Sequence, residues 1–355
     1  MRVHIPLPVG TSASRWAHRH ERGEVPDASP YGLHHLQDHG WDVTFGGREL
    51  TGPVARIARS VRYRTSGLEL VEVGADLRRM SRTESDVVLG YDERTGVPAA
   101  LAVPRSRFAP VVTGVGWLTS RAAAAPLQRR LAARALPRAA AVWTQCSAML
   151  PMLGREWQVP AERLHYVPLG IDTDFYAEQP WEQATATVVS AGEDVFRDHA
   201  LLVEAVRRVS RHVPAVRLEL ATSHPIELPD DLGTLHTRRM DGAMRGLYAR
   251  SSVVAVALKR TSTGSGLTVV LEAMASGRPV VVTANPGMSD YVEHGVDGLL
   301  VPPDDVDAFA AALRELLADP QRCAEMGRAA AARARAEFTS AGMSAVLAGI
   351  LASSV

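Results

Sequence analysis

The sequence predicts an α/β protein made of two Rossmann-like, doubly wound domains. Short β-branched runs alternate with helical patterns along the chain, which is typical of parallel sheets covered by helices on both faces. At 355 residues the chain is also too long for one ordinary hydrophobic core. Residues 167–185 carry proline, glycine and polar residues without periodicity, as an interdomain connection does. We therefore expect two domains facing each other across a cleft, with the ligand at the carboxyl ends of the strands.

The first half begins with the run HIPLPVG, which predicts a strand that reaches Gly10. A polar loop rich in His and Arg follows over residues 12–29, and an amphipathic segment at 31–40 closes at a glycine. Short β-branched runs that end in turn signals predict further strands at 41–46, 68–74, 85–91, 111–116 and 140–145.

The second half repeats this scheme. Apolar runs predict strands at 187–192, 216–223, 253–259, 279–283 and 298–303. Helical periodicity predicts helices at 199–213, 242–251, 305–319 and 323–338, and a further helix around Glu272. The acidic fragments at 229–231 and 305–307 are interpreted as helix caps rather than metal ligands.

Composition excludes several classes of function. Basic and acidic residues number 39 each, so no bulk attraction to nucleic acid is expected. Cys146 and Cys323 lie far apart without metal-type spacing, which indicates neither a disulfide framework nor a zinc site. No GxGxxG motif follows the first strand of either half, which counts against a dinucleotide-dependent oxidoreductase. Without a signal peptide or an 18-residue apolar stretch, we expect a cytoplasmic protein.

Arginine is concentrated in the first half, notably at Arg56, Arg59, Arg62 and Arg64. Such a cluster could attract an anionic membrane surface or an acidic acceptor. A helix face that contacts only water is the commoner explanation of such a cluster. Peripheral membrane contact remains the alternative.

Residues 264–283 carry the strongest functional signal. Glu272 lies inside the apolar run TVVLEAMA, and a buried carboxylate needs a polar partner. If the helix starts near Gly266, Glu272 lies one turn beyond Thr268, on the same face as the helix N-terminus. Free N–H groups and the positive end of the helix dipole bind phosphate there. Phosphate and a hydroxyl-rich group beside Glu272 together describe a nucleotide sugar; a core helix whose glutamate pairs with an arginine is the alternative.

The motif EAMASGRPVVVT at 272–283, followed by NPGMSDYVEHGVDGLLVPPDD, resembles a family signature. The family is the large group of retaining GT-B glycosyltransferases with a Glu-x7-Glu motif, glycosyltransferase family 4. Residues 167–176 resemble its interdomain segment, and residues 188–206 resemble the strand, basic phosphate-binding loop and helix that open its second domain. The resemblance is specific over residues 164–320 and only organisational over the N-terminal half.

This resemblance implies the GT-B architecture. An acceptor-binding domain is expected at 1–171 and a nucleotide-sugar-binding domain at 172–337. The remaining segment, 338–355, is expected to form a C-terminal helix with the option of packing back on the first domain.

The resemblance also assigns roles to residues of the second domain. Glu272 matches the glutamate that holds the ribose hydroxyls of the nucleotide. The backbone N–H groups of Gly266, Leu267 and Thr268 match those that meet the diphosphate. Arg197 falls where the family places a phosphate-binding lysine, and a guanidinium can bind diphosphate in a bidentate way.

Two further residues are assigned to the phosphates. Lys259 ends the strand predicted at 253–259, at the edge where the ligand is expected. Gly10 matches the glycine that lets the N-terminal domain approach the diphosphate.

The sequence departs from the family pattern at three places. Gly264 stands eight residues before Glu272, where the first motif glutamate belongs; an extra residue in the loop makes Thr263 the alternative occupant of that place. The basic residue expected early in the phosphate loop is replaced by Glu193. The segment VVTGVGWLT lacks the family's histidine, so its polar candidates are Thr113, Trp117 and the backbone nearby.

The resemblance implies a glycosyltransferase that moves a sugar from a nucleoside diphosphate sugar to an acceptor hydroxyl with retention of configuration. We expect a UDP-sugar donor, no metal or other cofactor, and a small-molecule, lipid or glycan acceptor. Arg197, Lys259 and the helix amides would stabilise the leaving diphosphate. The alternatives are a nucleotide-sugar epimerase of the same fold and a degenerate protein that binds a nucleotide sugar, or supports a partner enzyme, without turnover.

Overall fold

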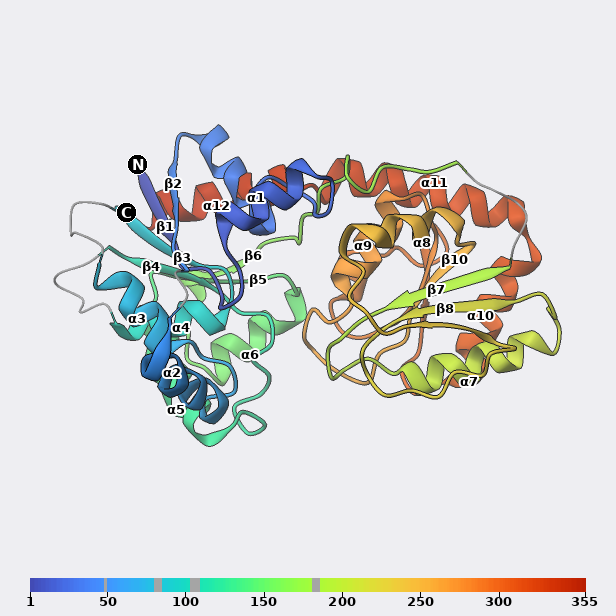
Figure 1. Cartoon of the computed structure of the whole chain (residues 1–355), viewed down its shortest axis with the longest axis horizontal. Helices are drawn as coiled ribbons and strands as arrows, with labels where there is room; N and C mark the ends of the chain where they lie inside the picture. The colour runs from blue at the N-terminus through green and yellow to red at the C-terminus, as the bar shows by residue number, and fades with distance from the viewer. Residues whose placement is uncertain (48–49, 80–84, 103–108, 181–185) are drawn as a thin grey trace. The chain divides into compact units, whose positions relative to one another are not determined.

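The computed structural model describes residues 1–47, 50–79, 85–102, 109–180 and 186–355 (Figure 1). These residues form two compact units. Unit 1 comprises Met1–Glu21, Asp27–Pro168 and Ser340–Val355, and unit 2 comprises Arg22–Pro26 and Leu169–Thr339. Each unit holds one six-stranded sheet in which neighbouring strands pair in parallel. The predicted fold class, two doubly wound α/β domains, is confirmed.

The sheet of unit 1 has the strand order β2-β1-β3-β4-β5-β6. Its strands are β1 (Arg2–Ile5), β2 (Asp42–Phe45), β3 (Val87–Gly90), β4 (Val111–Gly114), β5 (Ala141–Thr144) and β6 (Leu164–Tyr166). Its helices are α1 (Ala13–Glu21), α2 (Gly52–Arg64), α3 (Leu70–Leu77), α4 (Glu93–Ala102), α5 (Pro126–Ala135), α6 (Leu150–Arg155) and α12 (Ser340–Ser353), with a 3-10 segment η1 (Pro30–His39). Strands β3, β4 and β5 are buried throughout, as expected for parallel strands covered on both faces.

The sheet of unit 2 has the strand order β12-β11-β10-β7-β8-β9. Its strands are β7 (Thr187–Ala191), β8 (Arg217–Ala221), β9 (Gly233–His236), β10 (Val253–Val256), β11 (Val280–Thr283) and β12 (Gly298–Val301). Its helices are α7 (His199–Ser210), α8 (Met244–Arg250), α9 (Leu267–Ala275), α10 (Val306–Ala318) and α11 (Pro320–Glu337). Helices α7 and α10 pack together on one side of the sheet, and α9 packs with α11 (Figure 1).

The strand predicted to reach Gly10 is shorter than expected. β1 ends at Ile5, and Gly10 lies in the turn that follows, with a positive φ of 85°. Pro6 and Pro8 explain the early end, because neither has the N–H group that a central strand must donate to its neighbour.

The strand prediction for 68–74 is wrong. Residues from Leu70 onward form helix α3, with Val73 and Leu77 buried one turn apart. That spacing is the helical period, and it prevails over the β-branched composition of the run. The segment 12–29, predicted as a loop, also holds helix α1, in which no residue is fully buried. The cap prediction is confirmed at Asp305, which accepts the Ala308 N–H, and is wrong at 229–231, where no helix follows.

The C-terminal helix α12 belongs to unit 1, where it packs against η1 (Figure 1). The Ser344 hydroxyl donates to the Gly32 carbonyl at 3.2 Å, and the Ser340 hydroxyl donates to Asp27 Oδ1 at 2.9 Å. Gly32 has a φ of 68°, and a Cβ atom added there would lie 2.4 Å from Ser340 Cβ. Only glycine therefore lets η1 and α12 approach this closely.

Gly32→Ala is expected to destabilise unit 1 by about 3 kcal/mol, through the left-handed backbone and the clash with α12 together. Gly40→Ala is the matched control, because Gly40 has a φ of 79° with no atom near its added Cβ. This control should lose only about 1 kcal/mol, the backbone cost alone. Chemical unfolding of both variants measures the difference. Equal losses would contradict the close packing of η1 against α12.

Candidate active site

The predicted site residues of the second domain gather at the carboxyl edge of the unit 2 sheet. The strand order reverses between β7 and β10, and ligands of open α/β sheets bind at such a switch point. The loop after β7 runs from Gly192 to Asp198, and the loop after β10 runs from Ala257 to Gly266. A backbone bridge between Arg197 and Leu258 joins the two loops.

Arg197 is buried between two glycines. A Cβ atom on Gly192 would lie 2.1 Å from Arg197 Nε, and a Cβ atom on Gly266 would lie 3.5 Å from Arg197 Nη1. Both glycines also have positive φ angles. The guanidinium group therefore requires glycine at position 192, whereas at Gly266 the added Cβ would clash with Val256 at 2.9 Å and make only an ordinary contact with Arg197.

The Arg197 guanidinium is only partly satisfied. Its Nε donates to Asp194 Oδ2 at 2.8 Å, whereas its buried Nη1 has no hydrogen-bond partner among the described residues. Gly266 is the N-cap of α9, so this N–H lies beside the positive end of a helix dipole. Burying an unpaired cationic N–H group next to another positive potential is costly unless an anion joins them. An anion placed here would satisfy both the unpaired N–H and the helix N-terminus.

Asp194 organises this site, although it is not among the residues predicted from the sequence. Besides holding Arg197, its Oδ1 accepts the Ser265 hydroxyl at 2.8 Å and the Phe196 N–H at 3.0 Å. One carboxylate thus connects the loop after β7 with the loop before α9. The sequence offers little to predict this role: Asp194 is simply an acidic residue between Gly192 and Arg197.

Lys259 lies next to the same loops but is exposed. Its backbone N–H donates to the Phe196 carbonyl at 2.8 Å, and its Nζ lies 3.4 Å from the Val195 carbonyl oxygen. The ammonium group is therefore held near Arg197 by a weak contact and can turn toward a ligand.

Glu272 lies in α9 and is half-buried. The Tyr248 hydroxyl donates to its Oε2 at 2.7 Å, and the Tyr176 side chain is a second hydrogen-bond partner. Burial raises the pKa of the Glu272 carboxyl, while the two tyrosines and the nearby positive charge of Arg197 oppose that rise. The hydrogen-bond partners of this carboxylate are thus two phenols rather than an arginine, and neither tyrosine was predicted from the sequence.

The loop before α9 holds the remaining predicted residues. α9 begins at Leu267, one residue after its N-cap, and carries no side-chain cap. The Leu267 N–H makes a long bond of 3.4 Å to the Gly264 carbonyl, so a ligand at this helix start would replace only a weak contact there. Thr268 is exposed in that first turn. Thr263 is buried, and its hydroxyl bonds the Thr261 hydroxyl at 2.9 Å. Thr263 and Gly264 both lack a carboxylate, so the place of the family's first glutamate is not acidic.

The polar candidates of unit 1 differ in exposure. Thr113 is fully buried beneath α4, where a Cβ atom on Gly96 would lie 1.7 Å from its hydroxyl oxygen, so Thr113 is a packing residue. Trp117 is half exposed. Gly10 lines a cavity together with Val9 and residues of α2 and α3.

Two buried glutamates of unit 1 were not anticipated from the sequence. Glu69 accepts the Val9 N–H with both carboxylate oxygens, at 3.1 and 3.0 Å. Glu93 accepts the N–H groups of Gly116 and Trp117 at 2.9 and 3.0 Å. Burial raises the pKa of each carboxyl to about 7, against the pull of these N–H donors. Both glutamates thus position loops at the carboxyl edge of the sheet.

These raised pKa values predict how stability depends on pH. Between the unfolded pKa of 4.5 and the folded pKa of about 7, the folded state binds more protons, so stability falls as pH rises through that window. We expect the free energy of unfolding of unit 1 to decrease from about pH 5 to about pH 8, and Glu93→Gln to flatten this slope. Urea unfolding at several pH values across this window measures the slope. Glu162→Gln is the control, because Glu162 is exposed. An unchanged slope in Glu93→Gln would contradict the raised pKa.

Metal ligation has one candidate among the described residues. Asp27, His34 and His35 of unit 1 offer ligand atoms within 4.8 Å of one another. No helix within the described ranges is long and apolar enough to cross a bilayer.

Models of known families match both halves of the chain. The model described as "Glycosyltransferase Family 4" matches residues 33–175, and the one described as "Glycosyl transferases group 1" matches residues 185–319. The chain belongs to the family 4 glycosyltransferases of GT-B fold. The family therefore extends over the N-terminal half, where the sequence alone showed only a common organisation.

Curated relatives match about half of the chain. A GDP-mannose-dependent alpha-(1-6)-phosphatidylinositol monomannoside mannosyltransferase of Mycolicibacterium smegmatis is 31% identical over 193 residues, which cover 47% of this chain and 50% of the relative. A D-inositol 3-phosphate glycosyltransferase of Kribbella flavida is 33% identical over 204 residues, which cover 49% of this chain and 47% of the relative. The matched segments thus span about half the length of these relatives.

Solved structures match the whole fold. A sucrose-phosphate synthase from Thermosynechococcus elongatus superimposes with a TM-score of 0.73 at 16% identity, over 98% of this chain and 97% of that one. Anabaena HepE in complex with UDP and glucose gives a TM-score of 0.71 at 18% identity, over 99% of both chains. At these identities the likeness shows the GT-B fold alone.

Proposed function

We propose that this protein is a retaining glycosyltransferase that uses a nucleoside diphosphate sugar. The observation that carries the proposal is the buried Arg197 N–H without a partner, placed beside the N-terminus of α9. A diphosphate supplies the anion that this N–H and the helix N-terminus lack. Glu272 lies in the same helix and can accept ribose hydroxyls, which fits a nucleotide rather than a free phosphate.

The proposed reaction needs charge stabilisation more than side-chain chemistry. The bond between the anomeric carbon and the phosphate oxygen breaks while the acceptor hydroxyl forms a new bond on the same face. The hydroxyl proton passes to a phosphate oxygen of the leaving group. Arg197, Lys259 and the amides of Leu267 and Thr268 would stabilise the charge that develops on the diphosphate.

The donor and acceptor are also proposals. A UDP-sugar is the proposed donor; HepE, which shares the fold, has been solved in complex with UDP and glucose. GDP-mannose is the alternative donor, because the name of the Mycolicibacterium relative describes that enzyme as GDP-mannose-dependent. Their names also point to a cyclitol or a lipid headgroup as acceptor. We propose that no metal takes part, so activity should survive a chelator.

Turnover with a panel of UDP-, GDP-, dTDP- and ADP-sugars tests the proposal. Release of one nucleoside diphosphate in the presence of EDTA, with a product whose anomeric configuration by NMR matches the donor, is the expected result. If a nucleotide sugar binds but no nucleoside diphosphate is released with any acceptor, a degenerate nucleotide-sugar-binding protein is favoured instead. An inverted product would exclude the retaining mechanism.

A further inference from the structure

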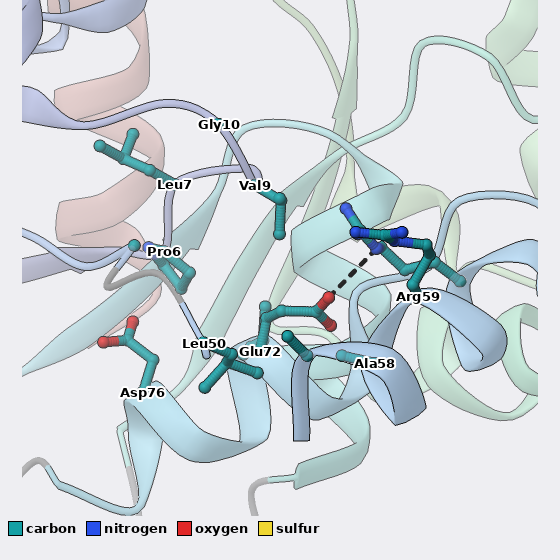
Figure 2. Close-up of a pocket in the computed structure, with 13 residues that line it drawn as sticks. Pro6, Leu7, Val9, Gly10, Leu50, Ala58, Arg59, Glu72 and Asp76 are labelled. Atoms are coloured by element: carbon teal, nitrogen blue, oxygen red, sulfur yellow. Dashed lines mark ion pairs between the residues drawn. The ribbon is translucent and has the colours of Figure 1, made fainter. Parts of the chain in front are cut away.

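Unit 1 contains a cavity of about 190 Å³ at the carboxyl end of β1. It is bordered by the turn from Pro6 to Gly10 and by helices α2 and α3 (Figure 2). Its apolar wall includes Leu7, Leu50 and Val73, and its polar wall includes Arg59, Glu72 and Asp76. This volume equals about six water molecules at about 30 Å³ each, which is room for one small ring.

Three buried polar atoms at this cavity make no hydrogen bond with a described residue. Arg62 Nε lies 3.1 Å from Glu72 Oε1 as an ion pair, but neither this nitrogen nor either Glu72 oxygen makes a hydrogen bond within the described part of the chain. The Glu72 side chain is only 10% exposed. Buried polar atoms are rarely left unsatisfied, so this ion pair has hydrogen-bonding capacity left for a ligand in the cavity.

The donor and acceptor character of these atoms indicates which kind of ligand the cavity suits. Glu72 offers only acceptors, and Arg62 Nε offers only a donor. A hydroxyl group donates and accepts at once, so adjacent hydroxyls on one ring can satisfy both residues. An anion would be repelled by Glu72, and a purely apolar ligand would leave all three atoms unsatisfied. The apolar wall would then cover the C–H faces of the ring.

The far end of the cavity offers a second carboxylate. Asp76 Oδ2 bonds His4 Nε2 at 2.9 Å, and His4 Nδ1 bonds the Thr44 hydroxyl at 3.1 Å. These contacts fix the orientation of the Asp76 side chain. Figure 2 shows Asp76 and Arg59 on opposite sides of Glu72, so a ring beside Glu72 would have a carboxylate at one end and a guanidinium at the other.

Charge distinguishes the two ends. Arg62 is paired with Glu72, and Asp76 is bonded to His4, whereas exposed Arg59 makes no ion pair with any described residue. The surplus charge at the Arg59 end is therefore positive. That end favours an anionic substituent outside the ring-binding part of the cavity.

We propose that this cavity binds one six-membered polyhydroxylated ring with an anionic substituent, the ring at Glu72 and the anion at Arg59. Its role as the acceptor subsite rests on the glycosyltransferase function proposed above. A soluble sugar or cyclitol phosphate and a lipid headgroup both carry this chemistry. Helix α2 also exposes Val54 and Ile57, which lie one turn apart, so a ring attached to a lipid has exposed apolar side chains on the same helix.

Calorimetry on the full chain tests the cavity directly. Myo-inositol 1-phosphate and glucose 6-phosphate are the ring probes, with inorganic phosphate and myo-inositol as partial probes. We expect at least one ring phosphate to bind, Glu72→Gln to weaken it at least tenfold, and Arg59→Ala to weaken the phosphorylated ring more than the neutral ring. Arg56→Ala is the matched control, since Arg56 is exposed on the same helix but does not line the cavity.

The outcomes separate this inference from the proposed function. Sedimentation with vesicles, with and without phosphatidylinositol, distinguishes a lipid headgroup from a soluble ring. Binding of either ligand that depends on Glu72 supports the proposal that the cavity binds the ring. Equal binding by wild type and Glu72→Gln, binding of inorganic phosphate alone, or no binding of any ring overturns it. Nucleoside diphosphate binding measured on the same samples shows whether the donor site stands independently.

Discussion

Glu272→Gln is expected to weaken the binding of a nucleoside diphosphate by about tenfold to hundredfold. Hydrogen bonds to a charged acceptor contribute about 1.5–3 kcal/mol, and the variant replaces that charge with a neutral amide. The amide NH₂ group also cannot accept hydrogen bonds from the tyrosine hydroxyls that now orient the carboxylate. The nucleotide would therefore lose both a charged partner and its fixed geometry.

Isothermal titration of wild type and variant measures this loss. Glu325→Gln is the matched control, because Glu325 is exposed on α11 of the same unit. Tyr248→Phe adds a second check: it keeps the carboxylate charge, so affinity should fall by less than in Glu272→Gln. An unchanged affinity in Glu272→Gln would show that the nucleotide does not bind against α9.

Arg197→Ala is expected to lower kcat by about 10² to 10³-fold, the effect of removing one donor to a developing negative charge. Arg197→Lys should retain part of the rate, because it keeps the positive charge but not the bidentate geometry. The effect should fall on kcat more than on KM if the guanidinium acts mainly on the departing diphosphate.

The rate of nucleoside diphosphate release at several donor concentrations gives kcat and KM. Arg260→Ala serves as the control, since Arg260 is exposed and pairs with Asp304 at 2.6 Å instead of facing the glycines of the loop. Loss of Arg197 also leaves Asp194 without its cation, so the double variant Arg197→Ala/Asp194→Asn separates loop damage from lost catalysis. A kcat within twofold of wild type in Arg197→Ala would contradict its role.

Sequence patterning predicted most of the fold because parallel strands are buried on both faces. The runs around β7, β10 and β11 are almost entirely apolar, which leaves little ambiguity. The edge strands β6 and β9 were missed, since most of their residues are only partly buried and carry no such signal. Their existence depends on pairing with a neighbour, which a local pattern does not reveal.

The site could be predicted only where it follows local sequence. Glu272 and Arg197 stand next to glycine-rich turns at helix starts, so their places were deduced from motif spacing. Tyr176 and Tyr248 reach Glu272 from segments far away in the chain, and only tertiary packing brings them together.

The cavity in unit 1 was missed for a related reason. It depends on Glu72, Val73 and Asp76 sharing one face of α3. The strand predicted over that run would have placed Glu72 and Val73 on opposite faces.

The central claim is that the carboxyl edge of the unit 2 sheet binds a nucleoside diphosphate. Calorimetric titration of the wild-type chain with UDP, GDP, dTDP and ADP, in the presence of EDTA, tests it most directly. Saturable binding of one of them at a single site per chain is the predicted result. Silence from all four would contradict the reading of Arg197 and the α9 N-terminus as a diphosphate site.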